Sequence, residues 1–400
     1  MRHSWELPDP QDDHVLASGC ESRQLSHLTN TVGAFMRRVL AVAVMLVTIP
    51  ALVLVGCTTS RSGDEPELAT GLDRVLAAGA PGVLVVVRED GKVRSEARGF
   101  ADRSRSIRMR ADQRFRVGSI TKTFVAALVL LLVEDGTLRL DDTVERWLPG
   151  LVPAGRAITV RDLLSHTAGL FDYVEDDRVL RDHERRWTPR ELVSIAVAHA
   201  PERSPPGESF AYSSTNYLVL GLIVEEAGGQ PLDLQLRERL FGPLGLRRTS
   251  FVTGEIRGLH VHGHRPPSHQ GVVTGPPVDT SAEPAWWTWA AGAIVSTGRD
   301  LQQFFAALLR GRVLSPPLLR EMETLVPAGR LQYGLGIATF PTPCGPAWGH
   351  TGNVQGTIAV AWNTKDASRQ LVLVVNTYPL SAELEEAVRQ VHDAAFCSAD

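Results

Sequence analysis

The sequence predicts an antiparallel β-sheet closed by both ends of the chain, flanked by N- and C-terminal helices, with a mainly helical lobe inserted. Three observations predict this α+β/α fold. Strand patterns gather near the two ends of the body, at 83–87, 333–337, 357–362 and 371–376. Helical patterns with proline and glycine breaks fill most of about 141–290. The apolar run 123–133 is too short to span a bilayer, so we interpret it as a buried central helix.

Composition is that of a globular protein with room for one large or two medium domains. The chain has 400 residues, of which 44% are hydrophobic and 22% are charged. A net charge of −4, spread along the chain, argues against nucleic acid as the main partner. Four cysteines are too few for a disulfide scaffold.

The N-terminal region carries an export signal. Residues 1–35 are polar, and Met36-Arg37-Arg38 then precedes the apolar stretch 39–55. A basic segment, an apolar segment and small residues before a cleavage point are typical of exported proteins. Leu54-Val55-Gly56-Cys57 resembles the lipobox of bacterial lipoproteins, in which the cysteine becomes the acylated N-terminus. An ordinary transmembrane anchor is the alternative, and both interpretations place the body outside the cytoplasm.

The position of this signal also bears on where translation starts. An export signal normally stands at the N-terminus, so we expect Met36, rather than Met1, to be the true start. We interpret the segment 58–65 as a flexible tether between Cys57 and the folded body.

The elements of the body follow from their patterns in chain order. Residues 66–78 predict an amphipathic helix, and the strand 83–87 returns through the turn 89–92 as a hairpin. Ser381 caps a last helix, in which Leu384, Val388 and Val391 share a face. Further helices are predicted at 160–165, 189–199, 215–227, 232–240 and 300–309.

The stretch 118–122 (GSITK) opens the buried central helix and carries the most informative pair of residues. Ser119 and Lys122 are three apart, so a helix would place both side chains on one face. A serine hydroxyl becomes a good nucleophile when an adjacent amine and a helix N-terminus help to remove its proton. A lone Ser-x-x-Lys is common by chance, and its partners downstream are therefore decisive.

Two further stretches complete a constellation. They are Phe210-Ala211-Tyr212-Ser213-Ser214-Thr215-Asn216-Tyr217 and Gly349-His350-Thr351-Gly352-Asn353. With Ser119 and Lys122, their order closely resembles the penicillin-recognising serine hydrolases, which include serine DD-peptidases, class C β-lactamases and related esterases. The resemblance covers roughly Leu68 to Cys397 and is strongest to exported actinobacterial D-alanyl-D-alanine carboxypeptidases.

The resemblance implies a role for each motif residue. Ser119 attacks an acyl carbonyl and becomes the acyl-enzyme, Lys122 polarises it, and Tyr212 shuttles the proton as base and then as acid. His350 stands where the family often has lysine, and the backbone N–H groups of Ser119 and Asn353 form the oxyanion hole. The implied substrate-binding residues are Ser214, Trp287, Thr351, Gly352 and Gln355. No metal or other cofactor is implied.

Three departures bear on the substrate. Ser214 stands where the family usually has an asparagine, whose amide holds the acyl side chain. Ala338 and Asn353 stand where the carboxypeptidases have an arginine and a hydroxyl that grip a peptide carboxylate. Because a buried carboxylate needs a cation or strong donors, an esterase or amidase fits at least as well. Arg181, in the helical lobe, is the alternative candidate for a cation that reaches the cleft.

Other features receive structural interpretations. The turn Ser165-His166-Thr167 looks like a second copy of the third motif but lies at a helix end in the family. His260, His262, His264 and His269 lack a regular zinc-ligand pattern. The carboxypeptidases carry a disulfide at the positions of Cys344 and Cys397, so the resemblance implies that bond here.

The resulting hypothesis is an exported serine acyl hydrolase, D-alanyl-D-alanine carboxypeptidase- or β-lactamase-like. It would be anchored to the cell membrane through Cys57, or secreted, and would act on a small acyl or peptide substrate such as a peptidoglycan stem peptide or a β-lactam. Two alternatives stay open, a carboxylesterase and a non-catalytic sensor of penicillin or peptidoglycan. The expected organisation is a leader at 1–57, a tether at 58–65 and a hydrolase domain at 66–400, with a sheet part at about 66–140 and 291–400 and a helical lobe at about 141–290.

Overall fold

The computed structural model describes residues 64–397, apart from 183, 204, 270–271 and 274. The leader, the signal and Cys57 lie outside the described residues, and so does nearly all of the tether. Among the helices that the structure describes, none is both long and apolar enough to cross a membrane.

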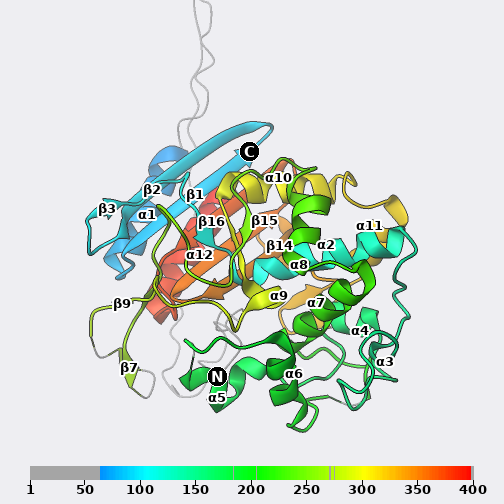
Figure 1. Cartoon of the computed structure of the whole chain (residues 1–400). Coiled ribbons are helices and arrows are strands. Elements are labelled where there is room, and N and C mark those ends of the chain that lie inside the picture. Colours follow the sequence, from blue (N-terminus) through cyan, green and yellow to red (C-terminus); the bar gives the residue numbers. More distant parts are fainter. Residues whose placement is uncertain (1–63, 183, 204, 270–271, 274, 398–400) are drawn as a thin grey trace, which may run out of the picture. The chain divides into compact units, whose positions relative to one another are not determined.

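A nine-stranded antiparallel sheet forms the centre of the fold, in the order β11-β12-β13-β14-β15-β16-β1-β2-β3 (Figure 1). The first and last long strands pair directly, from Val83 with Val375 to Glu89 with Arg369. This pairing confirms that both ends of the body close one sheet. The strands are β1 (Gly82–Glu89), β2 (Lys92–Asp102), β3 (Ile107–Arg108), β11 (Val326–Ala328), β12 (Leu331–Tyr333), β13 (Ala338–Thr342), β14 (Gly345–Val354), β15 (Thr357–Asn363) and β16 (Arg369–Val375).

The helices agree with most of the predicted ranges. Thr159 and Thr188 each cap a helix in a reciprocal capping box, and Ser381 caps the last one as predicted. The helices are α1 (Asp64–Ala77), α2 (Thr121–Glu134), α3 (Val144–Trp147), α4 (Val160–Leu164), α5 (Asp177–Arg181), α6 (Pro189–Val197), α7 (Ser214–Gly228), α8 (Leu232–Leu236), α9 (Trp289–Gly292), α10 (Gly298–Leu309), α11 (Pro316–Met322) and α12 (Ala382–Phe396), with short turns η1 (Gly118–Ile120), η2 (Tyr173–Glu175) and η3 (Arg237–Phe241).

Two predictions about local structure were wrong. The expected strand at 333–337 is a turn between β12 and β13, where Gly334 N–H donates to Ile337 O and Gly336 has a left-handed φ of 79°. The later part of the lobe also contains short strands rather than helix alone. These are β5 (Ser250–Phe251), which joins β4 (Phe115–Arg116) and β10 (Ile294–Ser296), the pair β6 (His264–Arg265) and β9 (Val278–Asp279), and the pair β7 (Ser268–His269) and β8 (Val272–Val273).

The sheet is covered on both faces, which explains why β1 is apolar without alternation. Val83, Val85 and Val87 belong to a core that also contains residues of α1 and α12, and those two helices pack on each other. Leu84 and Val86 point to the opposite face and join the main core with α2 and α10. Figure 1 shows α12 lying along the sheet and the helices α3, α4, α6 and α7 gathered below α2 in this view.

Helix α2 is the buried helix that the apolar run predicts. Its buried residues run without interruption from Thr121 to Leu130. The ring of Phe124 stacks on that of Phe304 in α10, with centroids 3.6 Å apart. Packing on all sides fixes the direction of this helix, and therefore also fixes the residues at its N-terminal end.

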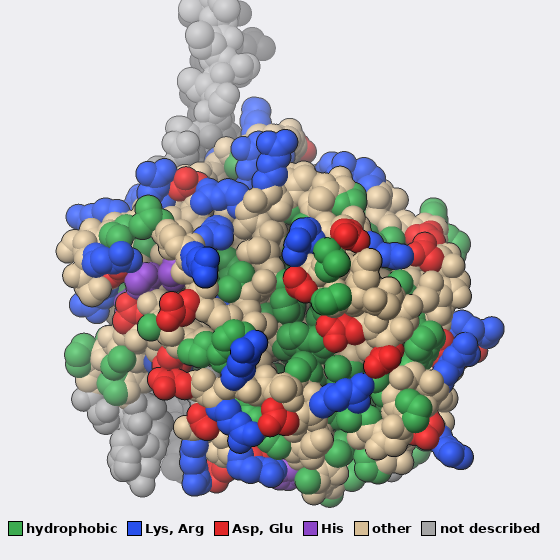
Figure 2. Space-filling model, viewed as in Figure 1, with side chains coloured by type: hydrophobic (Ala, Val, Ile, Leu, Met, Phe, Trp, Pro, Cys, Tyr) green, Lys and Arg blue, Asp and Glu red, His purple; other side chains and the backbone are tan. Residues whose placement is uncertain are grey.

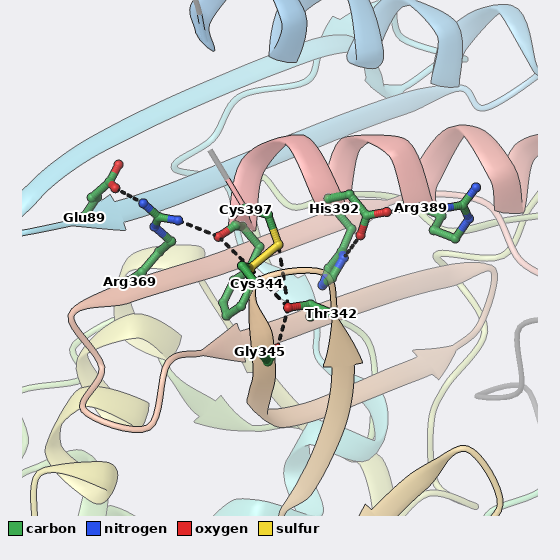
Figure 3. The surroundings of a disulfide bond; sticks show 10 residues. Glu89, Thr342, Cys344, Gly345, Arg369, Arg389, His392 and Cys397 are labelled. Carbon is green, nitrogen blue, oxygen red and sulfur yellow. Dashed lines mark hydrogen bonds and ion pairs between the residues drawn. A yellow bond between two sulfur atoms is a disulfide. The ribbon is translucent and has the colours of Figure 1, made fainter. Parts of the chain in front are cut away.

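A disulfide joins the turn before β14 to the end of α12 (Figure 3). Cys344 and Cys397 have an S–S distance of 2.10 Å and are 53 residues apart in the sequence. Close by, the Arg369 guanidinium donates to Phe396 O at 2.9 Å and pairs with Glu89 of β1. These contacts tie the last helix to the sheet.

Reduction of this bond, or a Cys344→Ser substitution, is expected to lower the free energy of unfolding by about 4 kcal/mol, since it frees a long loop in the unfolded chain. Urea unfolding of the oxidised and reduced protein measures the change, with Cys20 and Cys57 blocked in both samples. Intact mass with a thiol reagent counts the remaining free cysteines. Reaction of Cys344 and Cys397 without prior reduction would contradict the bond.

Candidate active site

Ser119 and Lys122 are held together at the start of the buried helix. Ser119 lies in η1, one turn before the Lys122 side chain of α2. Lys122 Nζ donates to Ser119 Oγ at 3.0 Å and to Ala291 O at 3.2 Å. Lys122 is fully buried, while Ser119 is partly exposed. The structure thus places an amine directly behind an accessible hydroxyl.

Tyr212 reaches the same hydroxyl from the helical lobe. Its phenol forms a side-chain hydrogen bond with Ser119, and Lys122 Nζ lies 4.9 Å from the centre of its ring. Ser214 begins α7, and its Oγ lies 3.5 Å from Lys122 Nζ. The second sequence motif therefore meets the first, and the hydroxyl of Ser214 takes part where the family usually has an amide.

His350 is buried in β14 and faces a tyrosine that sequence analysis missed. Its Nε2 lies 3.0 Å from Tyr333 Oη, and its Nδ1 contacts Thr351 O. Burial lowers the pKa of the His350 imidazole from 6.5 to about 3. His350 is therefore neutral at physiological pH, and it does not supply the charge that a lysine would give at this position.

The backbone of η1 lies flush against β14. A Cβ on Gly352 would stand 2.0 Å from Val117 O and 2.6 Å from Ser119 N, and a Cβ on Gly118 would stand 2.7 Å from Asn353 N. The N–H groups predicted for the oxyanion hole thus belong to two backbone segments in direct contact. Only glycine allows this approach.

One cavity of about 1020 Å³ collects the predicted residues. β13 pairs with β14 only as far as Gly349, so among the described strands the following part of β14 pairs with β15 alone and borders the cavity. Gln355 also borders it, but its amide donates to Glu283 O and thereby forms part of the wall. The predicted site residues on the lining are Ser119, Lys122, Tyr212, Ser214, Trp287, His350, Thr351, Gly352, Asn353 and Gln355.

Burial divides the acid–base roles between Lys122 and Tyr212. It lowers the pKa of the Lys122 ammonium from 10.5 to about 7, although the Asp172 carboxylate acts in the opposite direction. Burial also raises the pKa of the Tyr212 phenol well above its usual range. A neutral amine is therefore accessible near neutral pH and a phenolate is not, so the base is better assigned to Lys122 and the acid to Tyr212.

The pH profile tests this division. We expect kcat/KM to rise with pH through about 7 as Lys122 loses its proton, and to be lost below that value. Asp172→Asn removes the charge that raises the pKa of Lys122, so the midpoint should move to lower pH. Glu175→Gln is the matched control, because this cavity carboxylate is not among the groups that shift Lys122. An unchanged midpoint in Asp172→Asn would contradict the assignment.

Among the lining residues that were not found from the sequence, Asp172, Glu175 and Arg265 carry charge and Tyr333 contacts His350. Asp172 is only 1% exposed, and its sole sequence signal is its place just after the Ser165–Leu170 turn. Arg181 does not line this cavity. It pairs with Asp177 and borders an adjoining cavity of about 480 Å³, which shares Leu180 and Arg265 with the main one. Ala338 does line the main cavity and brings no charge.

The histidine-rich segment contributes one group with the donor types of a metal site. Among the described residues, Asp102, His262 and Asp279 could hold a metal ion. However, the Arg105 guanidinium pairs with Asp102 and lies 3.5 Å from His262 Nε2, while Asp279 and Ser281 both contact Nδ1. The positively charged Arg105 side chain already occupies this group, so the three residues do not fit a metal ion in addition.

Comparison with known proteins agrees with this geometry. The profile of the family described as Beta-lactamase matches residues 68–396. Penicillin-binding protein 4 of Amycolatopsis lactamdurans is 32% identical over 297 residues, which cover 68% of this chain and 74% of that protein. Esterase EstB of Burkholderia gladioli is 31% identical over 332 residues, which cover 73% of this chain and 80% of that protein.

A further relative and a solved structure complete the comparison. A relative from Bacillus subtilis (strain 168) is 29% identical, and the chain covers 63% of its length. The crystal structure of a D-stereospecific amidohydrolase from Streptomyces sp. has a TM-score of 0.75 at 33% identity, over 84% of this chain and 99% of that chain. This chain therefore belongs to the Beta-lactamase family and is a serine hydrolase.

Proposed function

We propose that this protein hydrolyses amides or esters through an acyl-enzyme on Ser119, and that its preferred substrates carry no carboxylate next to the scissile bond. The observation that carries the proposal is the charge of the cavity. Its acylation groups are complete, but both cations among the described lining residues are already engaged by other protein groups. The carboxypeptidase hypothesis from the sequence requires a cation that is available to a substrate anion.

The charged groups on the lining support this preference. Among the described lining residues the cations are Lys122, which is engaged with Ser119, and Arg265, which pairs with Glu283 at 2.8 Å. Asp172 and Glu175 add negative charge. Since a desolvated carboxylate needs a strong donor or a cation, the cavity favours neutral or cationic ligands. On the face shown in Figure 2, acidic and basic side chains are interspersed around hydrophobic ones, and the basic side chains do not form one continuous patch.

The mechanism follows from the order of contacts. Neutral Lys122 takes the proton of Ser119 Oγ as that oxygen attacks the carbonyl carbon, and the N–H groups of Ser119 and Asn353 hold the oxyanion. Tyr212 gives its phenol proton to the leaving nitrogen or oxygen as that bond breaks. The proton on Lys122 then passes to the phenolate of Tyr212, whose ring centre lies 4.9 Å from Nζ. Water next attacks the ester in the same way, which releases the acid and restores Ser119.

The named relatives fit this class of reaction. One is an esterase and one structural neighbour is a D-stereospecific amidohydrolase, so the family includes amide and ester hydrolysis. After Gly349, β14 pairs with β15 alone among the described strands, and we propose that backbone groups of this part bind an extended acyl group that carries an amide N–H and C=O. Location is also a proposal: we propose export and lipid anchoring at Cys57, supported by the signal and lipobox pattern of the sequence.

The test compares two capped dipeptides that differ only at the C-terminus, one a carboxamide and one a free carboxylate. With the full-length protein in detergent, we expect faster hydrolysis of the carboxamide and a Ser119-linked acyl mass on an activated ester. Ser119→Ala should lower kcat on the order of 10⁵- to 10⁶-fold.

Four outcomes would oppose the proposal. Preference for the free carboxylate, or a long-lived penicillin adduct, would favour the carboxypeptidase side. Capture of ligand without turnover would favour the sensor. Continued activity of Ser119→Ala would reject the nucleophile.

A further inference from the structure

His166, which the sequence suggests is only structural, lies directly beneath Tyr212. The residue follows α4 and is fully buried. Its ring centroid stands 4.2 Å from that of Tyr212, with a 31° angle between the planes. The rings of Tyr217 and Tyr333 enclose it further, at 5.2 and 4.9 Å. The imidazole is therefore in contact with the phenol assigned as the acid.

His166 also holds the backbone on both sides of Tyr212. Ala211 N–H donates to His166 O at 2.8 Å, and Ser213 N–H donates to His166 Nδ1 at 3.2 Å. The Asn216 amide lies 3.1 Å from the same nitrogen. One residue thus holds the backbone N–H groups of the residues before and after Tyr212 and also packs on its ring.

These contacts define the chemical state of the imidazole. Because Nδ1 accepts a backbone N–H, that nitrogen carries no proton, and the ring is the neutral Nε2–H tautomer. His166 has a left-handed φ of 58°, a conformation that is strained for a non-glycine residue. The surrounding contacts hold the residue in this conformation.

We propose that His166 is a positioning residue that acts through Tyr212. By holding the ring and the backbone N–H groups of Ala211 and Ser213, it keeps the phenol at Ser119 in the geometry that delivers a proton to the leaving group. A displacement of a catalytic group by about 1 Å can reduce the rate about 10²-fold. The contacts that His166 makes with Tyr212 and its neighbours therefore affect the rate directly. The inference rests on the proposed acyl-enzyme function, in which Tyr212 protonates the leaving group.

The test uses two substrates with one acyl group, a simple amide and a nitrophenyl ester. The amine of the amide must be protonated as it leaves, whereas nitrophenolate needs no acid. His166→Ala should lower kcat for the amide about 10²-fold and for the ester less than about threefold. His166→Asn should fall between, because its Oδ1 can replace Nδ1 as acceptor and asparagine tolerates the left-handed backbone. In a Tyr212→Phe background the selective loss should disappear.

Several results would overturn the inference. Equal losses on both substrates would indicate a merely structural role, and a selective loss that persists in Tyr212→Phe would show that His166 does not act through Tyr212. If His166→Ala does not fold, His166→Asn with and without Tyr212→Phe decides the question by the same ratio of amide to ester rates. An active Ser119→Ala would instead reject the proposed function. An inactive Ser119→Ala and an impaired Tyr212→Phe, with no selective His166 effect, would reject this inference alone.

Discussion

Lys122→Met is expected to lower kcat about 10³-fold or more while raising the stability of the fold. Methionine keeps the length of the buried stem and removes the amine that takes the proton of Ser119, and general acid–base catalysis contributes about 10²- to 10⁴-fold. The same amine is buried at a cost, which its lowered pKa reports. Steady-state kinetics and thermal unfolding of the same samples measure both effects.

The stability gain should depend on pH in a defined direction. The folded chain releases the proton of Lys122 at about 7, and the unfolded chain holds it up to 10.5. Wild-type stability therefore rises with pH between these values, and the advantage of Lys122→Met is greatest below about 7 and fades toward 10.5. Lys92→Met, at an exposed position on β2, is the control and should change neither property. Turnover within tenfold of wild type would reject Lys122 as the base.

Gly352→Ala is expected to lower kcat at least about 10²-fold, since it forces apart the two backbone segments of the oxyanion hole. The new Cβ would stand 2.0 Å from Val117 O and 2.6 Å from Ser119 N, and these are backbone atoms that cannot rotate away. The loss should appear in kcat for both amides and esters, because every acyl transfer forms an oxyanion. Rates of acylation from single-turnover experiments give the direct readout.

Gly254→Ala is the matched control for that substitution. A Cβ there would meet only the Trp286 ring, at 3.4 Å, and the backbone of Gly254 needs no left-handed φ. Its activity and unfolding midpoint should stay near those of wild type. If Gly352→Ala kept full activity, the close contact between η1 and β14 would have no part in catalysis.

Some features could be predicted because they depend on local pattern or on motif order. The apolar run after Ser119 specifies a buried helix, whichever elements pack against it. Strand patterns near the start and the end of the body specify one sheet that contains both of these regions. Ser119, Lys122, Tyr212 and His350 were recognisable because their motifs occur in the order of a known family. The strand predicted at 333–337 failed because Gly334 and Gly336 turn the chain inside an apolar stretch.

The amino-acid sequence by itself determined which groups are available: a serine, an amine and a phenol in motif order, and an alanine in place of a carboxylate-binding arginine. Only the tertiary structure decided how these groups behave. Burial lowers the pKa of Lys122 and keeps Tyr212 and His350 neutral, and the long-range contacts of Asp172, Tyr333 and His166 set their surroundings. The physical reason is that a pKa and a hydrogen-bond geometry depend on desolvation and on neighbours that are distant in the chain.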